Sequence, residues 1–97
     1  MKVSLTQDAE DELIDSARYY ASEANAELGR EFISEFERSL ALLQEHPKFG
    51  AVWRGVTRRL PLRRFPYTIV YVLRDDEIRV LAVAHQNRRP GFWKGRV

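Results

Sequence analysis

The chain has 97 residues, 44% of them hydrophobic and none of them cysteine, which supports one domain over residues 1–97 and excludes disulfides, thiolate metal sites and cysteine nucleophiles. The formal net charge of +2 is unevenly divided: residues 1–46 hold eleven Asp and Glu against four Lys and Arg (−7), and residues 47–97 hold three against twelve (+9). No apolar run reaches the roughly 18 to 20 residues of a membrane span, and the first residues lack a signal-peptide core, so we expect a cytoplasmic protein without a membrane partner.

The acidic half predicts a short strand followed by two helices. Residues 2–5 alternate in the way of a strand. Thr6 and Asn25 are each placed to cap a helix, because apolar residues recur every three or four positions over 9–24 and again over 28–43. We expect these helices to form an antiparallel hairpin that carries most of the acidic side chains.

The basic half changes to a period of two. After Pro47 ends the second helix, residues 47–55 are predicted as a loop and residues 56–63 as a half-buried strand. Pro61 cannot donate to a strand ladder, which places this strand near an unpaired edge. Residues 67–73 are apolar at nearly every position and predict a central strand covered on both faces.

The remaining segments complete the predicted topology. They are a turn over 74–77, a last strand over 78–85 and a basic tail over 86–97. The element order is β-α-α-β-β-β, which predicts an α+β fold of two layers, with the helical hairpin packed on a small, mainly antiparallel sheet.

Histidine is too sparse for a metal centre. His46 and His85 are the two imidazoles, and neither lies at metal-ligand spacing with the acidic residues. We therefore expect no metal and no other cofactor.

Three segments carry a family resemblance: the end of the second helix at 45–50, the strand at 62–71, and the ending at 83–90 with Trp93. In order, spacing and total length they resemble the RelE/ParE superfamily of toxins from bacterial type II toxin–antitoxin modules. The resemblance covers nearly the whole chain. It implies a βααβββ toxin domain that inhibits growth and a cognate antitoxin protein that neutralises it in a heteromeric complex.

The resemblance leaves two activities open, of which the first is enzymatic. RelE-like members are metal-independent endonucleases that cut messenger RNA on the ribosome. Attack by the RNA's own 2′-hydroxyl needs a proton acceptor, a cation for the extra phosphorane charge and a proton donor. For this activity the catalytic residues would be Arg59, Arg63, His85 and Arg88. Two positions depart from the pattern, because Thr68 follows Tyr67 where many such enzymes have arginine and Pro61 occupies an expected basic position.

The second activity is binding without cleavage. ParE-like members poison DNA gyrase, and for them the basic ending would be a target-binding surface made of Arg64, Arg88, Arg89, Phe92, Trp93, Lys94 and Arg96. Arginine and aromatic residues are enriched at interface hot spots. We favour this activity slightly over the nuclease, and a third alternative is a degenerate, non-toxic binding domain.

All of these alternatives rest on one spatial expectation. The arginines of the later strands and the tail should converge on one exposed face of the sheet, opposite the acidic helices. Trp93 would then either contact the target or pack the tail onto the domain.

Overall fold

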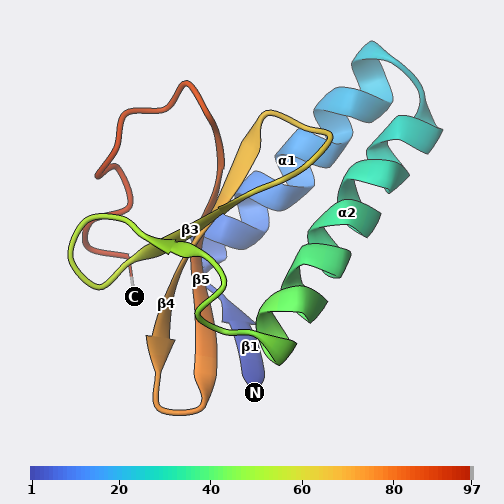
Figure 1. The fold of residues 1–97 in the computed structure, drawn as a ribbon. Coiled ribbons are helices and arrows are strands. Elements are labelled where there is room, and N and C mark those ends of the chain that lie inside the picture. Colours follow the sequence, from blue (N-terminus) through green and yellow to red (C-terminus); the bar gives the residue numbers. More distant parts are fainter. Residues whose placement is uncertain (97) are drawn as a thin grey trace.

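The computed structural model describes residues 1–96, which form two layers, a helical hairpin and a five-stranded sheet (Figure 1). In chain order the elements are β1 (Lys2–Leu5), α1 (Gln7–Glu23), α2 (Ala26–Glu45), β2 (Ala51–Val52), β3 (Arg58–Pro61), β4 (Tyr67–Arg74) and β5 (Glu77–His85). The strand order is β1-β5-β4-β3-β2, with β1 parallel to β5 and the other pairs antiparallel. The predicted α+β arrangement is confirmed. Val97, the end of the predicted tail, lies outside the described residues.

Both predicted helix caps are present. The Thr6 hydroxyl accepts a hydrogen bond from the Ala9 amide at 3.0 Å, and the Asn25 side chain accepts one from the Leu28 amide at 2.8 Å. Each bond satisfies an amide that the first turn of a helix leaves unpaired. Neither helix in the described part of the chain is long and apolar enough to cross a bilayer.

The central strand β4 separates two apolar clusters. Its alternating residues Ile69 and Tyr71 face the helices and pack in a cluster with Phe32, Phe36 and Leu43. Val70 and Val72 face the other way, where they pack with Leu81, Ala82 and Trp93. The prediction that this strand is covered on both faces is confirmed. The C-terminal segment supplies the second cover, and in Figure 1 it lies on the side of the sheet away from the helices.

A β-bulge in β5 frees one carbonyl group. The register passes from Val70 opposite Ala82 to Tyr71 opposite Val80, so Leu81 is an extra residue without a ladder partner. Its carbonyl oxygen accepts from the Thr6 hydroxyl at 3.2 Å and from the Arg96 guanidinium at 3.1 Å instead. The bulge therefore ties β5 to the start of α1 and to the C-terminal segment.

Two sequence predictions need correction around β3. The loop predicted over 47–55 contains a short strand, β2, and the strand predicted over 56–63 is reduced to Arg58–Pro61. The strand starts late because residues 54–57 form a tight turn, with Arg54 and Gly55 at φ values of 61° and 65°. Since β2 pairs only with Arg58 and Arg59, Pro61 lies where β3 has a free edge, as predicted.

The predicted turn over 74–77 is also shorter than expected. β4 continues to Arg74 and β5 begins at Glu77, so only Asp75 and Asp76 connect the strands. Arg74 and Glu77 pair across the hairpin, and Asp75 takes the left-handed conformation at φ 51° that a tight connection requires.

Tyr71 anchors the chain between α2 and β2. Its buried hydroxyl donates to the Pro47 carbonyl at 2.8 Å and accepts from the Gly50 amide at 3.0 Å. A Cβ atom on Gly50 would lie 2.5 Å from this hydroxyl, so only glycine permits the contact. Burial raises the pKa of Tyr71 above its ordinary 10.0, against the lowering effects of the Gly50 hydrogen bond and the nearby charge of Arg58.

We predict that Tyr71→Phe lowers the free energy of unfolding near neutral pH by about 1 to 3 kcal/mol, because two backbone groups lose a buried partner. The raised pKa means that the phenol ionises more readily in the unfolded chain, so its stabilising contribution is complete below pH 10 and declines as the pH rises further. Urea unfolding between pH 7 and about 11 should therefore show a steeper alkaline loss in the parent than in the variant. Parallel pH curves would contradict the assignment.

Candidate functional site

A hollow of about 420 Å³ lies on the face of the sheet away from the helices. We call it the arginine hollow, and its chemistry-bearing residues are Trp53, Arg59, His85, Arg88 and Phe92. These side chains come from the turn after β2, from β3, from the end of β5 and from the C-terminal segment. The fold therefore brings together three of the four residues predicted for RNA cleavage.

Aromatic rings hold the two arginines of the arginine hollow. The Arg59 guanidinium carbon lies 4.5 Å from the Trp53 ring centre, and the Arg88 guanidinium carbon lies 3.9 Å from that of Phe92. Trp53 stacks in turn on Trp93, with 4.6 Å between ring centres. A cation over an aromatic face gains roughly 0.5 to 1 kcal/mol at an exposed site, which favours these positions for both arginines.

Glu12 on α1 fastens the C-terminal segment at both ends. Its carboxylate accepts from Arg88 at 3.1 Å and from Arg96 at 3.0 Å, and it also accepts from the backbone amide of Val83 at 3.0 Å. Arg96 has a second acidic partner in Asp8 at 3.4 Å. From the sequence, Glu12 was only one of several acids near the start of a helix, because nothing in the spacing indicates that α1 lies beside the edge of β5.

The C-terminal segment, residues 86–96, packs onto the sheet through Trp93. This indole is only 3% exposed and lies in the apolar cluster with Val70, Val72 and Leu81. Phe92 is half-buried beside it, with the guanidinium carbons of Arg88 and Arg96 at 3.9 and 5.1 Å from its ring. The structure thus resolves the open question about Trp93, whose side chain covers the domain.

Other predicted residues lie away from the arginine hollow. Arg63 and Arg64 border a separate hollow beside α2, where buried Glu35 accepts from both of their backbone amides. The Arg64 guanidinium also lies 3.6 Å from Glu31. The expectation that all the arginines converge on one surface is wrong for Arg63 and Arg64, since the turn before β4 bends toward α2.

Arg96 is also drawn away from that surface. It bonds to Glu12, Asp8 and the Leu81 carbonyl, and its side chain is only 16% exposed. Arg89 and Lys94 are exposed, and within residues 1–96 neither forms an ion pair. They are the predicted target-binding cations whose charge is most available to a partner.

His85 is held by its neighbours. Its ring packs edge-on against Tyr67 at 5.3 Å between ring centres, and its Nδ1 accepts from the Asn87 amide at 3.1 Å. Because Nδ1 is the acceptor, the neutral ring carries its proton on Nε2 and has no free basic nitrogen while this bond is present. In the described part of the chain, no group of three His, Asp or Glu residues could hold a metal ion.

Comparison with known proteins gives a family match and a fold match. Residues 3–90 match the family model described as the ParE toxin of the type II toxin–antitoxin system parDE. A chain of the solved chromosomal ParDE TA system from P. aeruginosa has a TM-score of 0.77, covering 88% of this chain and 95% of that one. Its sequence identity of 20% supports likeness of fold alone. No curated protein matches the sequence significantly.

We predict that Glu12→Ala loosens the C-terminal segment. Loss of the carboxylate leaves the Val83 amide without its partner, which should cost about 2 kcal/mol of stability, and it releases both arginines. Trypsin should then cut faster after Arg88 and Lys94, whereas Pro90 blocks cleavage after Arg89. The circular dichroism bands of opposite sign expected from the stacked Trp53–Trp93 pair should weaken.

Glu10→Ala is the matched control, because Glu10 is exposed on the same helix and, within residues 1–96, forms no ion pair with Arg88 or Arg96. It should leave both readouts unchanged. Glu12→Gln keeps an acceptor for Val83 but loses the charge, so it should give an intermediate result. An unaltered cleavage rate in Glu12→Ala would show that Glu12 does not fasten the segment.

Proposed function

Because the chain belongs to the ParE toxin family of type II toxin–antitoxin systems, we propose that it arrests bacterial growth in the cytoplasm and is neutralised by a cognate antitoxin. The family match over residues 3–90 supports the toxin role. The antitoxin partner is supported by the ParDE system whose chain shares this fold. The target we propose is DNA gyrase.

The position of Arg63 and the contacts of Arg88 and His85 favour gyrase over messenger RNA as the target. Arg63 borders a different hollow, and the charge of Arg88 is balanced by Glu12. His85 uses Nδ1 to accept a backbone hydrogen bond from Asn87. Cleavage needs a base, an acid and a cation within reach of one phosphate. Here Arg63 lies elsewhere, Arg88 is paired with Glu12 and Nδ1 of His85 is occupied, so the arrangement favours cleavage less than binding.

The same contacts suit a binding surface. Arg59 and Arg88 are each stacked on an aromatic ring, so little side-chain freedom remains for a partner to remove. Arg89 and Lys94 are exposed on the fastened segment, and neither forms an ion pair within residues 1–96. We therefore propose that Arg88, Arg89 and Lys94 contact the target and that Trp93 supports them from below.

A second candidate function draws on one observation. Arg59 and His85 line the same hollow, and movement of Asn87 would free the imidazole to exchange a proton. This would support ribosome-dependent cleavage of messenger RNA, which the same experiment tests.

The experiment compares the two targets side by side with the purified protein. We expect trapped DNA breaks when it is added to gyrase and DNA, and intact messages when it is added to a translation extract. Arg89→Glu should reduce gyrase poisoning by roughly tenfold or more if this cation is an interface hot spot. His85→Ala should leave poisoning intact.

Arg30→Glu is the control for Arg89→Glu, because Arg30 is an exposed cation on α2 and lies outside the proposed surface. Cut messages that become intact in His85→Ala would establish the nuclease instead. Normal growth during expression of soluble, folded protein would leave the degenerate binding domain as the function.

A further inference from the structure

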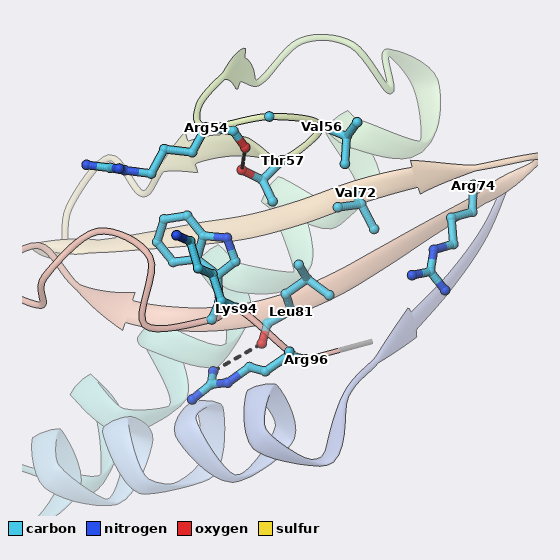
Figure 2. Close-up of a pocket in the computed structure, with 11 residues that line it drawn as sticks. Arg54, Val56, Thr57, Val72, Arg74, Leu81, Lys94 and Arg96 are labelled. Carbon is cyan, nitrogen blue, oxygen red and sulfur yellow. Dashed lines mark hydrogen bonds between the residues drawn. The ribbon is translucent and has the colours of Figure 1, made fainter.

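A second hollow, of about 430 Å³, lies beside the arginine hollow and is bounded by the turn at 54–57 and the segment at 93–96 (Figure 2). We call it the Val56 hollow. Its apolar lining is Val56, Val72, Leu81 and Trp93, and its cations are Arg54, Arg74, Lys94 and Arg96. Trp53 lines the arginine hollow and Trp93 lines this one, so the stacked indoles form the wall between the two.

Hydrogen bonds fix both walls of the Val56 hollow. On one side the Thr57 hydroxyl donates to the carbonyls of Arg54 and Trp53, which holds the left-handed turn at Arg54 and Gly55. On the other side the Arg96 guanidinium donates to the Leu81 carbonyl, and the Arg54–Thr57 and Arg96–Leu81 bonds are drawn as dashes in Figure 2. The hollow is therefore formed before any partner binds.

Val56 is held at the rim with most of its surface in water. It is 83% exposed, the highest value among the large hydrophobic residues of the described chain. Val52 and Phe49, which precede it in the same segment, are 61% and 59% exposed. Phe49 and Val52 lie outside the turn, in the preceding loop and in β2, so Val56 is the exposed apolar side chain that belongs to the Val56 hollow itself.

The charge of the Val56 hollow is largely unbalanced. Arg54, Arg74 and Lys94 form no ion pair within residues 1–96. In Figure 2 the side chains of Arg74 and Lys94 lie at opposite ends of the apolar floor made by Val72 and Leu81. A polypeptide segment could place an apolar side chain on this floor and a carboxylate on each side of it. It would then cover the apolar floor and pair with Arg74 and Lys94.

A nucleic acid fits these features less well. Bases bind proteins without sequence preference by stacking on exposed aromatic faces, whereas Trp93 is 3% exposed and stacked on Trp53. Phosphates would pair with the cations but leave Val56 uncovered. The lining therefore favours a polypeptide that is both acidic and apolar.

We propose that the Val56 hollow is the docking site for an acidic, amphipathic segment of the antitoxin. This inference rests on the proposed toxin function and locates the neutralising contact away from the arginine hollow. One apolar side chain of the antitoxin covers Val56, Val72 and Leu81, while its carboxylates pair with Arg74 and Lys94.

The test uses two single variants, Val56→Asp and Arg74→Glu, and the purified product of the small reading frame next to the toxin gene as the probe. Both residues are exposed and outside the proposed target surface, so each variant should fold and still arrest growth. Each should weaken binding of the probe by at least roughly tenfold, the loss typical of an interface hot spot. Co-expression of the probe should rescue growth less well than it does for the parent toxin.

Tyr19→Asp and Arg30→Glu are the matched controls, since Tyr19 is a 57% exposed aromatic on α1 and Arg30 an exposed cation on α2. They should bind the probe within twofold of the parent. If both test variants bind the probe as tightly as the parent does, the docking site is overturned while the toxin function stands. The same holds if the test variants lose affinity for DNA or RNA but still bind the probe. A parent protein that neither arrests growth nor binds the probe overturns the toxin function as well.

Discussion

The sheet has two apolar faces, and the helical hairpin covers only one of them. On the other face Val70, Val72 and Leu81 would be open to water if Trp93 did not lie over them. Burial of apolar surface is the main favourable term in folding. The basic C-terminal segment therefore contributes to the folded core of the domain, whether or not it also binds a partner. Glu12 makes this arrangement specific by holding the segment at both ends.

The acidic and basic halves of the chain form ion pairs with each other within the molecule. Acidic residues of α1 and α2 pair with arginines of the basic half, as in Glu12 with Arg88 and Arg96 and Glu31 with Arg64. Buried Glu35 binds backbone amides at the turn before β4. The positive field available to partners is consequently smaller than the count of +9 suggests, and it is concentrated in cations such as Arg89 and Lys94 that the helices do not reach.

The covered face of the sheet has two hollows with different chemistry. The arginine hollow has cations on aromatic rings and a histidine at its margin, while the Val56 hollow has an aliphatic floor lined by cations, of which Arg54, Arg74 and Lys94 form no ion pair within residues 1–96. The stacked indoles of Trp53 and Trp93 separate them. Such a division would allow one partner to be bound at Arg88 and Arg89 and a second at Val56 and Arg74, with Lys94 shared by the two proposed surfaces and Trp93 supporting both.

The elements with local signals could be predicted from the sequence. The caps at Thr6 and Asn25, the helix end before Pro47 and the apolar run of β4 depend on neighbours within a few residues, and they predicted the two-layer fold correctly. Tertiary structure alone decided which cations share a surface. Glu12 and Arg96 are 84 residues apart, and the bulge at Leu81 that helps to join them leaves no periodic signal. The pairing of Glu12 with Arg96 depends on how α1 packs beside β5, and the spacing of residues along the chain does not encode that contact.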